Sequence, residues 1–159
     1  MKAVLQRVRE ARVEVDGRIV GAVGRGLCLF VGVEKGDGPA DAAYVARKTA
    51  ELRVFPDSGG KMNLALAEFG GEVLAVSQFT LAGSVRKGRR PSFDKAEEPV
   101  RAAALFESVV AVLRSAGLRV ETGVFQAAMT VHLVNDGPVT FVLSSRDSAE
   151  EGRPASAVR

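Results

Sequence analysis

Apolar runs of strand length, gathered toward both ends of the chain, most constrain what it can fold into. Residues 2–8 are strand-like, and Val13 and Val15 alternate with polar neighbours before Asp16-Gly17. Alternation that ends at Asp-Gly and resumes as an apolar run is typical of a β-hairpin. Further strands are expected at residues 18–23, 27–33, 72–81, 118–122, 128–134 and 138–144. The pattern therefore predicts a strand-rich protein with hairpins near both ends.

Only two stretches have the periodicity of a helix. The first is expected after Pro39, because proline suits the first turn of a helix. Its apolar face would carry Ala42, Val45, Ala46, Thr49 and Leu52. The second is expected over residues 97–116, with Pro99 in its first turn and Gly117 as its stop. The glycine-rich residues 56–71 between them are expected to be mostly loop.

The element order β-β-β-α-β-α-β-β favours an antiparallel or mixed sheet over a doubly wound parallel one. The expected fold class is α+β, a curved mixed or antiparallel sheet or an open barrel with two helices. At 159 residues the chain is large enough for one hydrophobic core. A single domain is expected over residues 1–144, followed by a polar tail, 145–159, that we expect to be disordered.

The composition excludes several classes of protein. Cys28 is the only cysteine, so no internal disulfide can form, and its apolar neighbours favour a buried, inert thiol. His132 is the only histidine, so neither a zinc site nor a His-based catalytic triad is expected. No run is apolar enough for a membrane helix and charges interrupt the N-terminal segment, so we expect a cytoplasmic protein without metal or cofactor. The net charge of +3 permits RNA as a partner.

Polar side chains stand at the end of an apolar strand in the run SQFTL, residues 77–81. If the strand continues through this run, Ser77 and Phe79 share one face while Gln78 and Thr80 share the other. Buried polar groups need partners, and strand ends are frequent positions for functional sites. Spacing alone leaves two interpretations open: the polar groups satisfy the following loop, or they bind a substrate.

A basic loop follows, with four cations within five positions: Arg86, Lys87, Arg89 and Arg90. Such a cluster either binds phosphate groups or is a solvated loop. Phe93 lies close to it in the sequence and could stack on a base, although a single phenylalanine is more often part of a core.

Residues 133–143 read as two short strands around a turn at Asn135, Asp136 and Gly137. Asp-Gly alone can close a hairpin, whereas Pro138 removes a backbone donor at the point where pairing should resume. An ordinary hairpin therefore does not account for the Gly-Pro bond at the head of a strand.

Several segments in order resemble one family. They are QRV at 6–8, VDG at 15–17, GKMN at 60–63, SQFTL at 77–81, KGRRPSF at 87–93 and NDGPVT at 135–140. They are similar to the D-aminoacyl-tRNA deacylases of the bacterial and eukaryotic type, and the resemblance spans residues 1 to about 144. One departure is visible before Met129, where the family usually has Phe-Gly-Ala and this chain has Gln126 in place of the glycine.

The resemblance implies a homodimer that hydrolyses the ester between a D-amino acid and the terminal adenosine of tRNA. It implies that the backbone amides of Phe79 and Thr80 stabilise the oxyanion, while Ser77 and Gln78 orient them or bind the substrate. An aminoacyl ester is already activated, and the ribose 2′-hydroxyl can help direct water or a proton. Little side-chain chemistry is then needed beyond positioning and electrostatic stabilisation. The tRNA phosphates would contact Arg86, Lys87, Arg89 and Arg90.

The resemblance also gives Gly137-Pro138 a role. The bond is expected to be cis and to enter the site of the partner subunit, where main-chain carbonyls would engage the substrate's α-amino group and occupy the space of an L side chain. Arg7 is implied as a brace for this segment, and Asn135 and Met129 as further substrate-site residues. Glycine has no side chain to reject, so glycine mischarged on alanine tRNA should be cleaved too.

Two other hypotheses remain open at this point. Thr80 could be the covalent nucleophile of an esterase, which would require a base such as His132 beside it. Alternatively, the chain could be a non-catalytic RNA-binding module that uses the basic cluster at residues 86–90 as its contact surface.

Overall fold

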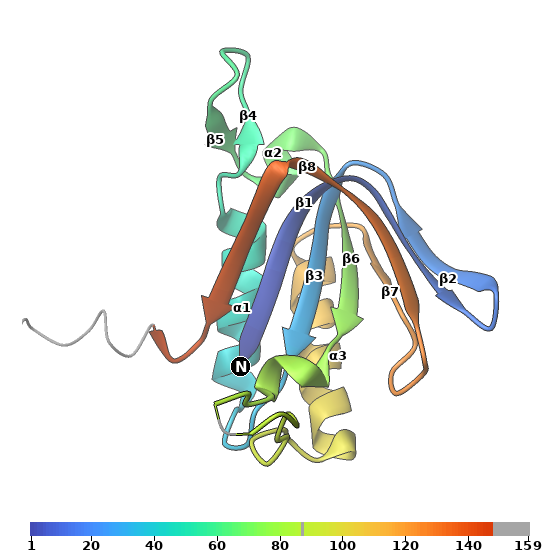
Figure 1. Ribbon diagram of the computed structural model, residues 1–159. Coiled ribbons are helices and arrows are strands. Elements are labelled where there is room, and N and C mark those ends of the chain that lie inside the picture. Colours follow the sequence, from blue (N-terminus) through green and yellow to red (C-terminus); the bar gives the residue numbers. More distant parts are fainter. Residues whose placement is uncertain (87, 148–159) are drawn as a thin grey trace, which may run out of the picture.

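The computed structural model describes residues 1–86 and 88–147. The strands are β1 (Lys2–Val15), β2 (Arg18–Val23), β3 (Gly26–Gly32), β4 (Phe55–Pro56), β5 (Met62–Leu64), β6 (Glu72–Ser77), β7 (Val120–Thr122) and β8 (Thr130–Ser144). The helices are α1 (Pro39–Glu51), α2 (Leu66–Phe69), α3 (Pro99–Ser115) and the 3-10 helix η1 (Phe79–Ala82). A six-stranded sheet curls in front of α1 and α3, and the β4–β5 hairpin projects beyond one end (Figure 1).

The sheet is mixed, as the sequence predicts. The long strand β1 pairs antiparallel with β2, β3 and β8, whereas β3, β6 and β7 run parallel. Parallel neighbours need a crossover between them, and α3 lies in the crossover from β6 to β7. At the far edge, Gly21 of β2 lies so close to the carbonyl of Thr122 in β7 that no side chain would fit there. This approach nearly closes the sheet into a barrel.

Two apolar layers stabilise the sheet. On one face, residues such as Leu5 and Leu29 pack against Val45 of α1 and Leu113 of α3, and all four side chains are fully buried. Inside the curl of the sheet, a second and smaller cluster contains Cys28. Burial raises the pKa of the Cys28 thiol to about 12, so the group stays protonated and inert at neutral pH, as the sequence predicts.

Three sequence predictions need correction. The chain has a third helix, α2, in the segment expected to be mostly loop. Residues 2–15 form one continuous strand rather than two separate ones. Residues 133–143 are not a hairpin, because β8 pairs with the same strand β1 on both sides of Gly137. Gln6 pairs with Thr140 and Val8 with Asn135, so β8 advances five residues while β1 advances two. The Gly-Pro segment is therefore an outward bulge within one strand.

The polar tail was expected to begin at residue 145, yet Ser145 is buried. Its amide donates to the carbonyl of Met1 at 2.9 Å, and its hydroxyl donates to Asp41. These bonds hold Ser145 against Met1, which precedes β1, and against Asp41 of α1. Residues 148–159 of the predicted tail lie outside the described residues. In the part of the chain that the structure describes, no helix is long and apolar enough to span a membrane.

Candidate active site

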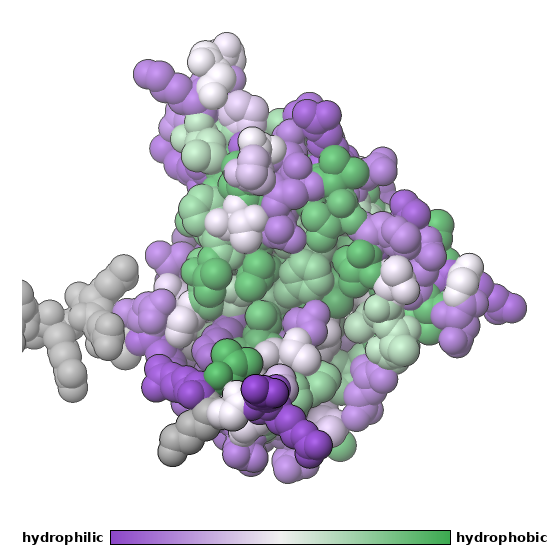
Figure 2. Space-filling model, viewed as in Figure 1, coloured by the Kyte–Doolittle hydropathy of each residue, from purple (hydrophilic) through white to green (hydrophobic). Residues whose placement is uncertain are grey.

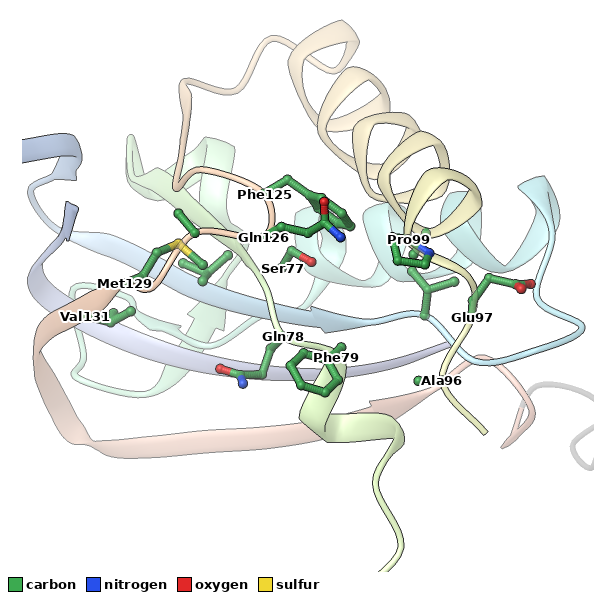
Figure 3. Close-up of a pocket in the computed structure, with 14 residues that line it drawn as sticks. Ser77, Gln78, Phe79, Ala96, Glu97, Pro99, Phe125, Gln126, Met129 and Val131 are labelled. Atoms are coloured by element: carbon green, nitrogen blue, oxygen red, sulfur yellow. The ribbon is translucent and has the colours of Figure 1, made fainter. Parts of the chain in front are cut away.

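A cavity of about 500 Å³ opens where β6 ends, between the start of α3 and the loop that follows β7 (Figure 3). Most of its wall is apolar. The lining residues are Val33, Val76, Ser77, Gln78, Phe79, Ala96, Glu97, Pro99, Ala102, Phe125, Gln126, Ala127, Met129 and Val131. Of the predicted site residues, the cavity therefore brings together Ser77, Gln78, Phe79 and Met129. A volume of this size matches the pockets that hold small ligands.

The SQFTL segment does not continue as a strand. The strand ends at Ser77, and the chain turns at once into η1, so the predicted alternation of faces is wrong beyond that residue. Gly32 of β3 explains the turn, because a Cβ on it would lie 2.6 Å from the Cβ of Leu81 and 2.9 Å from the carbonyl oxygen of Gln78. Only glycine lets η1 cross the sheet this closely.

The turn leaves backbone donors beside the cavity, which Gln78 and Phe79 line. The amide of Gln78 donates to the carbonyl of Val31 at 2.8 Å, which continues the pairing with β3. Phe79 and Thr80 are the first two residues of η1, and the first N–H groups of a helix have no acceptor within it. Neither amide has another backbone acceptor among the described residues. Two neighbouring N–H groups are thus available to a carbonyl oxygen.

Thr80 itself is absent from the cavity wall, and its hydroxyl accepts a hydrogen bond from the side-chain amide of Gln78. His132 does not line the cavity either. Its Nε2 lies 3.4 Å from Oε1 of Glu14, within ion-pair distance but outside hydrogen-bond geometry. Glu14 also accepts a hydrogen bond from Arg12, and that bond holds the pKa of the Glu14 carboxyl below its usual range. The histidine thus belongs to a charged group on β1 and β8.

A tight turn forms the opposite wall. The amide of Ala127 donates to the carbonyl of Val124 at 3.2 Å, and Gln126 has a φ of 63°. A positive φ at this position of a turn normally calls for glycine. The Gln126 side chain lines the cavity, and Figure 3 shows it beside Phe125. The departure noted in the sequence therefore places an extra carboxamide at the rim.

Sequence reasoning missed the wall contributed by the start of α3. Glu97 and Pro99 line the cavity there, and the Glu97 carboxylate lies 3.4 Å from Nε of Arg101. The one available signal was Pro99, which marks where the helix begins. Nothing in the sequence indicated that this helix start would face SQFTL.

The Gly137–Pro138 peptide bond is cis. The amide of Val139 donates to Oδ1 of Asn135 at 2.8 Å, which closes the bulge. Arg7 lies behind it: Nε donates to the carbonyl of Asp136 at 3.0 Å and Nη1 to the carbonyl of Val54 at 2.6 Å. Arg7 thus ties the bulge to the root of the β4–β5 hairpin.

This bulge lies far from the cavity of its own chain. Ser77 pairs with Val31, which pairs with Ala3 of β1, whereas Asn135 pairs with Val8. The register positions of Ser77 and Asn135 are therefore five residues apart along β1, which is roughly 16 Å at about 3.3 Å per residue. Strands β1 and β3 also lie between β8 and β6. Neither Gly137 nor Pro138 lines the cavity.

The basic loop is an arch whose neck is closed by two hydrogen bonds. Ser84 and Ser92 donate to each other's carbonyls at 2.8 and 2.9 Å. Beyond this neck the arch exposes three cations: Arg86, Arg89 and Arg90. Lys87, the fourth predicted phosphate contact, lies outside the described residues. Within residues 1–86 and 88–147, no group of three or more His, Cys, Asp or Glu side chains is arranged to hold a metal ion.

The family model described as D-Tyr-tRNA(Tyr) deacylase matches residues 4–144. Over 146 residues the chain is 59% identical to the D-aminoacyl-tRNA deacylase of Geobacter sulfurreducens, covering 92% of this chain and 96% of that one. It is 60% identical over 146 residues to the D-aminoacyl-tRNA deacylase of Anaeromyxobacter dehalogenans, covering 92% and 98%.

Two solved structures share this fold. One titled "c-Myc DNA Unwinding Element Binding Protein" is 40% identical, has a TM-score of 0.85, and covers 91% of this chain and 98% of that one. Another, titled "Structural Analysis of a probable eukaryotic D-amino acid tRNA deacylase", is 18% identical with a TM-score of 0.76, covering 89% and 97%, and supports the fold alone. These matches show the class of protein: the chain is an enzyme, a hydrolase, as predicted. It belongs to the D-Tyr-tRNA(Tyr) deacylase family.

Proposed function

We propose that the chain hydrolyses the ester between a D-amino acid and the terminal adenosine of tRNA, releasing both. The observation that carries this proposal is the pair of backbone amides at the start of η1: Phe79 lines the cavity, Thr80 follows it, and neither amide has a backbone acceptor among the described residues. An aminoacyl ester is reactive enough for water to attack once its carbonyl is polarised. Backbone donors fixed in place can stabilise the negative oxygen that then develops.

The chemistry needs few side chains. Water attacks the ester carbonyl, the carbonyl oxygen becomes an oxyanion between the two amides, and the ribose 3′-oxygen leaves with a proton. The neighbouring 2′-hydroxyl of the substrate is well placed to relay that proton. Ser77 and Gln78 line the same cavity and hold the ester in position. Positioning alone contributes substantially to the rate of such a reaction.

The selection of D substrates requires a second copy of the chain. The Gly137–Pro138 bulge lies too far along β1 to reach its own cavity, so it can contribute to catalysis only by entering the cavity of a partner. There, main-chain carbonyls would bind the α-ammonium group and fill the space that an L side chain needs. Because this selector is made of backbone, it would accept many D side chains and also glycine, including glycine mischarged on alanine tRNA.

The uncovered face of the sheet supports such a dimer. A row of apolar residues crosses it, because Val142 of β8 pairs with Val4 of β1, which pairs with Phe30 of β3. Val142 is 74% exposed, and none of the helices in the described residues covers this side. Figure 2 shows hydrophobic residues gathered over the middle of the face. A second copy would bury this row while each bulge reached the other's cavity.

The remaining assignments follow from the substrate. The exposed arginines of the arch would contact phosphates near the acceptor end of tRNA, and the enzyme would act in the cytoplasm, where aminoacyl-tRNA is found. The direct test is deacylation of matched D-Tyr-tRNA and L-Tyr-tRNA by the purified protein. Rapid release of D-tyrosine with the L ester spared is the expected result; equal rates on both esters would contradict chiral selection.

Complementation tests the shared site. One subunit carries Gly137→Ala, which disrupts the bulge because a Cβ there would lie 2.7 Å from Cγ2 of Val139. The other carries Phe79→Pro, which removes one oxyanion donor and should reduce the rate roughly 100- to 1000-fold. Each homodimer should be inactive, whereas the heterodimer recovers one working site. Heterodimers that form without regaining activity would show that the bulge acts within its own subunit.

A further inference from the structure

Two aromatic rings stand exposed beside the cavity. Phe79 is 57% exposed and Phe93 is 38% exposed, and their ring centroids lie 5.0 Å apart with an interplanar angle of 57°. We propose that this pair is a stacking site for an unpaired RNA base, the one that precedes the terminal nucleotide of the substrate. The proposal rests on the proposed function, since it assumes that the cavity holds the aminoacylated terminal nucleotide.

Hydrogen bonds of the loop backbone determine where Phe93 lies. Phe93 follows Ser92 directly, and the reciprocal bonds between Ser84 and Ser92 fix the backbone there. Its ring lies over Gly83, where an added Cβ would be 3.0 Å from Cε1 of Phe93. The carbonyl of Phe93 also accepts the amide of Ala96 at 2.9 Å. The backbone of Phe93 is thus held in place, and its ring packs over Gly83 and against Phe79 while staying partly open to solvent.

Leaving two large apolar rings exposed to water is energetically unfavourable, and a loop that is only solvated does not need them. Burying a phenylalanine side chain is favourable, and exposed apolar groups that lie together often mark a binding surface. The rings are tilted against each other and each keeps part of its surface open to solvent, so a ring face can receive a partner. A flat aromatic partner fits such a face, and every nucleobase has one.

The location selects RNA over other flat ligands. Phe79 lines the cavity and Phe93, which lies against it, does not, so Phe93 stands one ring further out, where a strand leaving the cavity on this side would pass. The arch that carries Arg86, Arg89 and Arg90 begins just beyond the neck beside Phe93. Aromatic rings next to cations are the combination that binds single-stranded nucleic acid: the bases stack while the phosphates are neutralised.

A base analogue that reports stacking provides the test. The probe is a short single-stranded oligoribonucleotide ending in adenosine, with 2-aminopurine as the preceding base, whose fluorescence falls when it stacks. The variant is Phe93→Leu, which keeps an apolar group over Gly83 but removes the ring. The matched control is Val100→Ala, because Val100 is an apolar residue at the start of α3 and is 86% exposed.

Wild-type protein and the Val100→Ala control should bind the probe and quench its fluorescence. Phe93→Leu should lose the quenching and bind roughly 5-fold or more weakly, since stacking of one base on an aromatic side chain is worth at least that. Adenosine alone, which occupies only the cavity, should bind wild type and Phe93→Leu equally. No binding or quenching by wild type, or equal binding and quenching by Phe93→Leu, would overturn the proposal.

The other explanation for the two exposed rings is a contact between copies of this chain, and the oligomeric state distinguishes it from a stacking site. If Phe93→Leu changed the sedimentation of the protein from dimer to monomer, the pair would be a contact between copies of this chain, and the stacking site would be wrong. Deacylation of D-Tyr-tRNA by wild type is measured in parallel. Intact deacylation with a Phe93→Leu enzyme that still quenches the probe refutes the stacking site alone, whereas absent deacylation refutes the proposed function.

Discussion

The side-chain amide of Gln78 donates a hydrogen bond to the hydroxyl of Thr80. This bond occupies one of the two lone pairs of the hydroxyl oxygen and fixes where that oxygen lies. His132, the only histidine, is not beside this hydroxyl to act as its base, since it lies with Glu14 and outside the cavity wall. The relationship therefore favours a positioning role: the bond holds Gln78 and the first turn of η1 in one geometry.

Replacing Thr80 by valine should leave most of the deacylase activity. The hydroxyl is not the nucleophile in this mechanism, so Thr80→Val should lower kcat by less than about tenfold, which is the scale of one lost hydrogen bond of roughly 0.5–1.5 kcal/mol. Single-turnover deacylation of D-Tyr-tRNA measures it, with Thr80→Ser as the control that keeps the hydroxyl. A loss of several thousandfold in Thr80→Val alone would restore the nucleophile hypothesis.

Replacing Gln126 by glycine should stabilise the protein while changing substrate binding. A residue other than glycine at a φ of 63° carries a conformational cost of about 1 kcal/mol, which Gln126→Gly relieves. The variant also removes a carboxamide from the cavity rim, so KM should change more than kcat. Thermal unfolding and steady-state kinetics measure the two effects. Gln126→Ala is the matched control, because it removes the carboxamide but keeps the strained conformation.

The arginines of the arch should determine the salt dependence of tRNA binding. Replacing Arg89 and Arg90 together by alanine should weaken binding and flatten the plot of log Kd against log salt by about one unit of slope per lost phosphate contact. Fluorescence titration of tRNA over a range of salt concentrations measures the slope. The control replaces Arg18 and Arg47, two exposed arginines on β2 and α1, which keeps the net charge matched. Identical slopes for the two double variants would show that the arch is only solvated.

Strand patterns predicted most of the sheet because alternation is a local property that each strand carries by itself. Pairing is not local, and this explains the error at residues 133–143. Asn135 to Gly137 have the residues of a turn, and only the pairing of both flanks with β1 shows that the chain continues in one direction. The four-residue helix α2 is too short to have a periodicity that could be recognised.

The same distinction between local and non-local features applies to the candidate site. SQFTL was found from its composition, but its turn into η1 depends on Gly32, a residue 45 positions earlier that leaves room for Leu81. The wall formed by Glu97 depends on how α3 lies against the sheet. Such contacts between distant segments leave no signal in the residues of either segment. The Phe79–Phe93 pair is a further example, since Phe93 alone resembled an ordinary core residue.

Arg7 should contribute more to the fold than Arg9, although both contact Asp136. The Arg7 side chain is 12% exposed and bonds two main-chain carbonyls, whereas the Arg9 side chain is 71% exposed and bonds the Asp136 carboxylate. Arg7→Leu should lower the free energy of unfolding by about 1.5–3 kcal/mol, the scale of hydrogen bonds from a charged group. Arg9→Leu should lower it by about 1 kcal/mol at most.

Urea unfolding measures both arginine variants, and the ratio of D-Tyr-tRNA to L-Tyr-tRNA turnover adds a second readout. Because Arg7 holds the carbonyl next to Gly137, its loss should also reduce that ratio. Equal unfolding midpoints for Arg7→Leu and Arg9→Leu would show that Arg7 does not brace the bulge.

Asp41 should make the stability of the fold depend on pH in the acid range. Partial burial acts to raise the pKa of its carboxyl, but hydrogen bonds from Ser145 and from the amide of Gly38, together with the ammonium of Met1, outweigh it. The net pKa lies below the ordinary value of 3.8. A depressed pKa in the folded state means that the unfolded chain takes up the proton more readily. The stabilising contribution is therefore complete above the ordinary pKa and disappears as pH falls through the lower, folded value.

The variant Asp41→Asn removes this titration while keeping the shape of the side chain. It should be less stable than wild type at pH 7, and the difference should shrink as the pH falls below about 4, because the protonated wild-type carboxyl loses its advantage there. Urea unfolding at closely spaced pH values between 2.5 and 7, in about 0.1 M salt, measures the difference. Glu51→Gln is the control, an exposed carboxylate at the end of α1. A wild-type advantage over Asp41→Asn that stayed constant across this range would show that the hydrogen bonds to Asp41 do not depend on its charge.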